Sequence, residues 1–186
     1  MSLHSSTGLL LAGGAGRRVN GQDKGLLLWQ GQALAEQVAA RLRPQVGQLL
    51  ISCNRNREYY AALADATVAD TRKGFQGPLA GLEAAAQSVD STFLVICPCD
   101  TPHLPLDLAA RLLRALTRSG KAISYAHDGE RGHYLCAAVR CNILPSLSRY
   151  LDTGGRAVRH WYAEQGACPV DFSDQPRSFS NLNELD

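Results

Sequence analysis

A glycine-rich segment near the start of the chain combines residue types that bind phosphate. It follows a short apolar run and reads Leu11-Ala12-Gly13-Gly14-Ala15-Gly16-Arg17-Arg18-Val19-Asn20-Gly21-Gln22-Asp23-Lys24. Glycines let the backbone approach a phosphate closely and turn several N–H groups toward one point, while Arg18 and Lys24 add positive charge. The segment therefore predicts a polyphosphate site. A plain flexible loop between a strand and a helix is the alternative interpretation.

Two common glycine motifs do not describe this segment. The dinucleotide-binding fingerprint requires glycine where Val19 stands, and the P-loop requires lysine where Gln22 follows Gly21. Any phosphate bound here must therefore be held in another way.

A carboxylate follows a second apolar run. Asp100 comes shortly after residues 92–97 and lies between Pro98 and Pro102, which restrict the turn. Magnesium prefers carboxylate and phosphate oxygens and keeps several waters, so one or two protein carboxylates suffice to hold it. We therefore expect Asp100 to be a metal ligand. The alternative is an aspartate that forms a turn or caps a helix.

The elements that must position these residues alternate along the first two thirds of the chain. Short apolar runs are followed by amphipathic segments, a pattern typical of an α/β fold with a mainly parallel, Rossmann-like sheet flanked by helices. The expected strands cover residues 7–12, 48–53, 67–69 and 92–97. The expected helices cover residues 33–43, 57–64, 79–88 and 106–118.

The pattern changes after Gly120. Residues 121–127 and 134–140 flank Asp128-Gly129, a dipeptide suited to a tight reversal, and therefore predict a small β-hairpin insertion. Residues 145–151 and 156–165 are expected to be helices, and residues 167–172 a last strand. Ligands of open α/β sheets bind beyond the carboxyl ends of the strands. We therefore expect the loops that contain Lys24, Asp70 and Asp100 to form the site.

Composition bounds the class of protein. A chain of 186 residues with 45% apolar and 19% charged side chains is typical of a single globular domain, covering residues 1–186. A net charge of +2 disfavours a general nucleic-acid or membrane-surface binder, and no apolar stretch predicts a membrane span or a signal peptide. The six cysteines show no C-x-x-C pair, so we expect free thiols in the cytoplasm rather than disulfides or a zinc site.

The motif L-A-G-G-x-x-R-R-x-x-G-x-D-K after an N-terminal strand resembles the signature of the molybdenum cofactor guanylyltransferases, a family of nucleotidyltransferases. The likeness extends over nearly the whole chain. It continues through Asn54-Arg55, Asp70, Gly77-Pro78-Leu79-Ala80-Gly81, Cys97-Pro98-Cys99-Asp100-Thr101-Pro102, His127-Asp128-Gly129-Glu130-Arg131 and Val170-Asp171-Phe172-Ser173-Asp174.

The resemblance implies a fold of the nucleotidyltransferase type and an activity. The expected enzyme transfers GMP from GTP to the phosphate of molybdopterin with Mg²⁺ and releases pyrophosphate. Lys24, Arg18 and Asp100 would be catalytic, and Asp100 and Asn183 would hold the metal. The nucleotide would contact Leu11, Ala12, Gly13, Gly14, Lys24, Ser52, Asn54, Asp70, Gly77, Pro78, Leu79 and Asp100. The nucleotide half would cover about residues 1–105, and the acceptor half about residues 106–186.

The acceptor carries a phosphate and a pterin, which call for arginines and polar loop groups. The candidates are His127, Asp128, Arg131, His133, Arg156 and Arg159. His133-Tyr134 departs from the His-Pro of the resembling proteins. The implied partners are GTP, molybdopterin, other cofactor-biosynthesis proteins and target molybdoenzymes. The alternatives are a nucleotidyltransferase for CTP with molybdopterin or for a sugar 1-phosphate, and a GTP-binding protein without catalysis.

Overall fold

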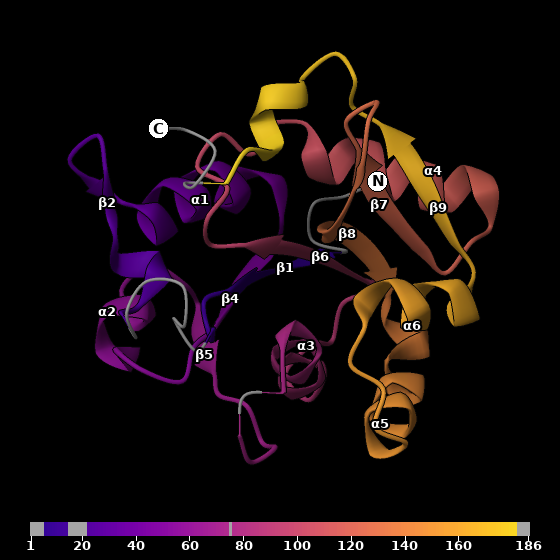
Figure 1. Ribbon diagram of the computed structural model, residues 1–186, viewed down its shortest axis with the longest axis horizontal. Coiled ribbons are helices and arrows are strands. Elements are labelled where there is room, and N and C mark those ends of the chain that lie inside the picture. Colours follow the sequence, from indigo (N-terminus) through magenta and orange to yellow (C-terminus); the bar gives the residue numbers. More distant parts are fainter. Residues whose placement is uncertain (1–5, 15–21, 75, 182–186) are drawn as a thin grey trace.

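One twisted sheet of seven strands runs through the molecule. The structure is a computed structural model that describes residues 6–14, 22–74 and 76–181. The strand order is β5-β4-β1-β6-β8-β7-β9 (Figure 1). Neighbouring strands are parallel, except that β8 is antiparallel to both β6 and β7. Their bounds are β1 Ser6–Leu11, β4 Gln48–Ser52, β5 Ala66–Val68, β6 Phe93–Pro98, β7 Ile123–His127, β8 Gly132–Arg140 and β9 Ala167–Asp171. The predicted α/β class and mainly parallel sheet are confirmed.

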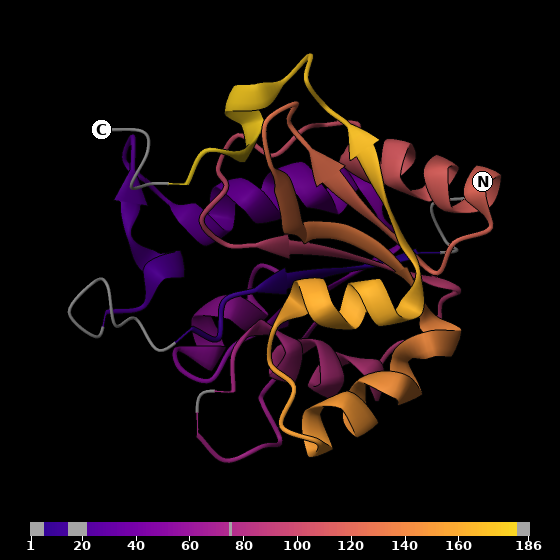
Figure 2. The ribbon, with the colours of Figure 1, turned by 45° about the vertical axis from the view of Figure 1, so that its right-hand side comes forward.

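Helices cover both faces of the sheet (Figure 2). Alternate side chains of a strand point to opposite faces, so Leu10 packs in one apolar cluster and Leu9 in the other. The first cluster includes α1, Leu34–Leu42, and α4, Leu108–Ser119. The second includes α3 Pro78–Ala86, α5 Leu144–Asp152 and α6 Val158–Gln165. The two clusters therefore pack against the sheet from both sides.

The helix α2, Arg57–Ala61, ends three residues before its expected end. The N–H groups of Ala62 and Leu63 bond to the carbonyls of Tyr59 and Tyr60, three residues back, so the chain tightens into a turn. The other expected helices and strands each lie within two residues of the observed bounds.

The predicted hairpin forms, and its two strands are part of the main sheet, where β8 pairs with both β6 and β7. The same sheet therefore contains strands of both expected halves. A second hairpin, between β2 Leu28–Trp29 and β3 Gln32–Ala33, was not predicted. Its turn is Gln30-Gly31, with positive φ at both residues.

Short helical turns connect several elements. They are η3 Lys24–Leu26, η4 Arg43–Gln45, η5 Cys141–Ile143 and η6 Pro176–Phe179. All six cysteines are free, as predicted, and four of them are buried. Within the described part of the chain, no helix combines the length and apolar character needed to cross a membrane.

Candidate active site

A pocket of about 260 Å³ opens where β1, β4, β5 and β6 end. These four strands are parallel, so the loops that follow them meet at one edge of the sheet. The lining residues are Leu11, Ala12, Gly13, Gly14, Lys24, Ser52, Asp70, Gly77, Pro78, Gly81, Pro98, Cys99, Asp100 and Leu135. The three loops singled out in the sequence therefore share one cavity.

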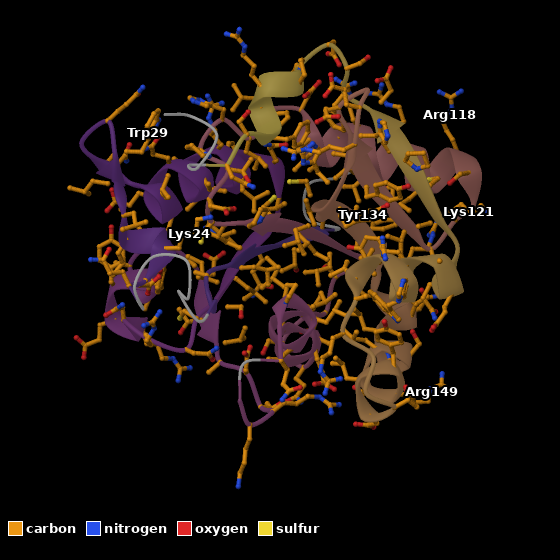
Figure 3. All side chains as sticks on the ribbon, viewed as in Figure 1. Lys24, Trp29, Arg118, Lys121, Tyr134 and Arg149 are labelled. Atoms are coloured by element: carbon orange, nitrogen blue, oxygen red, sulfur yellow. The ribbon has the colours of Figure 1, made fainter. Side chains whose placement is uncertain are left out.

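Lys24 and Asp100 form an ion pair inside this pocket. The Nζ of Lys24 lies 2.5 Å from Oδ2 of Asp100, and both side chains are partly exposed. Lys24 begins η3, and Asp100 follows β6 by two residues. Figure 3 shows Lys24 on the opposite side of the molecule from the basic side chains of Arg118, Lys121 and Arg149. The pocket thus contains the ammonium group of Lys24, which is paired with the carboxylate of Asp100.

The turn that carries Asp100 is anchored to the sheet. The N–H of Cys99 donates to the carbonyl of Leu11, 3.1 Å away, which continues the pairing of β1 with β6 beyond Pro98. The adjacent Thr101 is buried. Burial raises the pKa of the Cys99 thiol to about 12, with the charge of Asp100 adding to the effect. Cys99 therefore remains a neutral thiol beside the carboxylate.

Asn54 connects the glycine segment to Asp70. Its side-chain N–H donates to the carbonyl of Gly13 at 3.2 Å and to Oδ2 of Asp70 at 2.9 Å. Its side-chain oxygen accepts from the N–H of Asp70. Asn54 does not line the pocket itself, but it forms hydrogen bonds with two residues that do, Gly13 and Asp70.

Asp70 has one side-chain oxygen that no described residue satisfies. Its Oδ1 is buried and has no hydrogen-bond partner among the described residues. Burial raises the pKa of Asp70, although the hydrogen bond from Asn54 opposes that shift. Because a buried carboxylate oxygen without a donor is costly, the site favours a ligand that supplies one.

The start of α3 forms another wall of the pocket. Gly77 precedes the helix with φ +83° and ψ −175°, a conformation open to glycine, and Pro78 is the first helical residue. A Cβ at Gly81 would lie 2.4 Å from the hydroxyl of Ser52, so glycine lets α3 approach β4 closely. Leu79 is buried in the apolar cluster and does not line the pocket.

Two expected site residues, Arg18 and Asn183, lie outside the described residues. In the ranges that the structure covers, no three His, Cys, Asp or Glu side chains are grouped as a metal site would require. Asp100 and Asp70 are the carboxylates that line the pocket.

Four of the expected acceptor residues gather at the β7–β8 turn. His133 Nε2 lies 2.7 Å from Oδ2 of Asp128, and its ring stacks on Phe179 with centroids 4.6 Å apart. Arg131 is 3.9 Å from the same Asp128 oxygen, and His127 accepts from the N–H of Gly129. None of the four lines the pocket, but Leu135, two residues beyond His133 on the same strand, does.

The other two acceptor candidates are elsewhere. Arg156 donates to Gln76 at 2.7 Å and to the carbonyl of Leu151, and Arg159 is exposed on α6. Figures 1 and 2 place the α5–α6 connection and the β7–β8 turn at opposite ends of the molecule. The six residues therefore do not form one cluster.

Sequence reasoning did not assign four of the lining residues. Gly81, Pro98 and Cys99 belong to the motifs quoted above, so their positions beside assigned residues gave a signal. Leu135 belongs to none of them, and only the pairing of β8 with β6 brings it to the pocket.

Comparisons with known proteins identify the family of the chain. Residues 8–168 match the model of the MobA-like NTP transferase domain. The chain is 42% identical over 177 residues to the molybdenum cofactor guanylyltransferase of Pasteurella multocida, covering 95% of this chain and 94% of that one. It is 37% identical over 186 residues to the enzyme of that name from Shewanella putrefaciens, covering 100% and 95%.

A solved structure shares the fold. Molybdopterin-guanine dinucleotide biosynthesis protein A from Archaeoglobus fulgidus superposes with a TM-score of 0.78 at 22% identity, covering 97% of this chain and 93% of the other. Matches of this length and identity show that the chain belongs to the molybdenum cofactor guanylyltransferases, within the MobA-like NTP transferase family.

Proposed function

We propose that the pocket binds GTP together with Mg²⁺ and that the chain transfers GMP to the phosphate of molybdopterin, releasing pyrophosphate. The observation that carries this proposal is the contact of Lys24 with Asp100 at the ends of parallel strands. A triphosphate needs a cation to bind its oxygens and a carboxylate to bind its metal, and both lie within one pocket. The names of the full-length relatives supply the substrates.

The residues fit a magnesium site of the kind that substrates complete. Asp100 offers a carboxylate inside the pocket, and Mg²⁺ takes most of its remaining ligands from phosphate and water. Asn183 would be a further oxygen donor. When bound, the ion would neutralise charge on the phosphate oxygens.

The protein groups would act by position and charge. A phosphate oxygen of molybdopterin forms a bond to the α-phosphorus of GTP, and the bond to the β-phosphate oxygen breaks. Lys24 would exchange its contact with Asp100 for the triphosphate, leaving the carboxylate to the metal, and Arg18 would neutralise the departing pyrophosphate. The N–H groups of Gly13 and Gly14 would orient the nucleotide, and no protein nucleophile is needed.

Asp70 would accept a hydrogen bond from the nucleotide. Its unsatisfied Oδ1 is buried at the pocket wall, so a donor on the ligand would remove an existing cost. The remaining walls would be formed by Ser52, Gly77 and Pro78. Asn54 and Leu79 do not line the pocket and would support these walls from outside it.

The acceptor would approach from the β8 side of the pocket, where Leu135 lines it. His127, Asp128, Arg131 and His133 would then bind its phosphate or pterin, while Arg156 and Arg159 lie farther away. Free thiols are consistent with a cytoplasmic location, where other cofactor-biosynthesis proteins and molybdoenzymes would be the partners.

A competition assay tests the proposal. The protein is incubated with Mg²⁺, molybdopterin and each nucleoside triphosphate in turn, and pyrophosphate release is measured. Of the nucleoside triphosphates, we expect only GTP to give pyrophosphate release. Pyrophosphate release with CTP would show that CTP is the nucleotide substrate. Release with a sugar 1-phosphate in place of molybdopterin would show that the sugar 1-phosphate is the acceptor. GTP binding without release would reject catalysis.

A further inference from the structure

Three groups hold the carboxylate of Asp23, the residue directly before Lys24. Its Oδ1 accepts from the hydroxyl of Tyr60 at 2.7 Å and from the N–H of Gly25 at 3.2 Å. Its Oδ2 accepts from the side chain of Asn56 at 2.9 Å. Asn56 lies in the connection after β4 and Tyr60 lies in α2, both more than thirty residues along the chain from Asp23.

The geometry explains the glycine after Lys24. A Cβ on Gly25 would lie 2.4 Å from the Tyr60 hydroxyl oxygen, so the hydroxyl occupies the space over a buried glycine. Tyr60 is itself fully buried. Burial raises the pKa of Tyr60 well above its ordinary value, and its hydrogen bond to Asp23 adds to this. The hydroxyl therefore stays protonated and donates.

Asn56 reaches the carboxylate from the exposed side. It adopts the left-handed conformation, φ 50° and ψ 37°, immediately before α2. Asparagine tolerates this conformation better than most residues. From this position its side-chain N–H donates to Oδ2 of Asp23.

The position of Asp23, directly before Lys24 in the chain, could weaken phosphate binding by Lys24. A carboxylate adjacent to Lys24 in the chain could pair with the ammonium group and neutralise it. In the structure the carboxylate is instead occupied by neutral donors, and Lys24 extends to Asp100 in the pocket. Asp23 does not line the pocket.

We infer that Tyr60 and Asn56 are positioning residues that keep Asp23 away from Lys24 and so keep the Lys24 ammonium available to the triphosphate. This inference rests on the proposed function. Neither residue touches the pocket, so both act through Asp23.

Binding of Mg²⁺–GTP and of GMP, measured by calorimetry, tests the inference. Tyr60→Phe keeps the buried ring and removes the donor. We expect its affinity for GTP to fall about tenfold, as for loss of a hydrogen bond to a charged group. Affinity for GMP, which lacks the β- and γ-phosphates, should be unchanged. Asn56→Gly removes the second donor while permitting the same backbone conformation, and should act in the same direction.

The matched control is Tyr59→Phe, in the neighbouring tyrosine whose hydroxyl donates to Glu36 on the surface. It should leave GTP binding unchanged. In a Lys24→Ala background, Tyr60→Phe should cause no further loss, because its effect passes through Lys24.

Several results would overturn the inference. The inference is wrong if the Tyr60→Phe and Asn56→Gly variants bind GTP as tightly as the unaltered chain. It is also wrong if they lose as much affinity for GMP as for GTP, or if Tyr60→Phe lowers GTP affinity further in the Lys24→Ala background. Failure of the unaltered chain to bind GTP would reject the proposed function and this inference together.

Discussion

Lys24 and Asp100 are 76 residues apart in the chain, and their side chains meet 2.5 Å apart in the pocket. Each stands on a loop that follows a strand of the same parallel array, β1 or β6. The pairing therefore depends on the register of the two strands rather than on local sequence. Substitution of either residue therefore tests the proposed site directly.

Lys24→Ala or Asp100→Ala should reduce turnover with GTP by at least about a hundredfold, the effect of removing one group that stabilises transition-state charge. The melting temperature should change little, because each group is replaced at the wall of an open pocket. The control is Arg43→Ala, which breaks the exposed pair of Arg43 with Asp65 and should leave turnover unchanged. Normal turnover in either site variant would reject the assignment.

Removal of divalent metal should stop the reaction. With EDTA present, pyrophosphate release from GTP should fall to background, and added Mg²⁺ should restore it. Asp100→Asn keeps the shape of the side chain but removes a charged ligand, so it should require more Mg²⁺ for half-maximal rate. A rate that does not respond to EDTA would contradict the magnesium proposal.

Gly77→Ala should weaken GTP binding and destabilise the fold by about 1–3 kcal/mol, because φ +83° with ψ −175° strains a residue that has a Cβ. Urea unfolding and GTP titration measure the two effects. Gly120→Ala is the control, because Gly120 ends α4 with φ +67°, away from the pocket. It should lower stability by about 1–2 kcal/mol and leave GTP affinity unchanged.

Stability should fall in acid partly through Asp128. Burial alone raises the pKa of Asp128, but the N–H groups of Arg131 and Glu130 and the side chain of His133 outweigh it, so the pKa lies well below its usual range. A depressed pKa stabilises the fold above the pKa of the unfolded chain, about 4, and that contribution is lost as pH falls below it. The unfolding free energy of Asp128→Asn should therefore depend less on pH between about 5 and 2. Parallel pH profiles for the two proteins would contradict this.

The periodicity of apolar residues predicted most of the fold. Strands such as β6 are buried on both faces and bounded by turns, so their limits are legible. The hairpin β2–β3 was missed because two-residue strands carry no periodic signal, and Gln30-Gly31 is a weak turn signal without them.

The site was predictable where consecutive letters form a motif. Lys24, Asp70 and Asp100 each follow a strand, and parallel strands bring such positions together. Leu135, Tyr60 and Asn56 were not predicted, because their roles depend on contacts across the fold. Leu135 depends on the pairing of β8 with β6, and the other two on the hydrogen bonds that α2 and the residue before it donate to Asp23.

The direction of β8 has a consequence for the evolution of acceptor choice. Because β8 runs antiparallel to β6, its first residues, rather than its last, come to the edge of the sheet where the pocket opens, and the β7–β8 turn projects beyond it. A turn at the end of a paired hairpin can change length and composition without disturbing the strands that carry it. Under the proposed function, related chains could therefore change the second substrate by exchanging this turn, while the pocket residues that follow the parallel strands are retained.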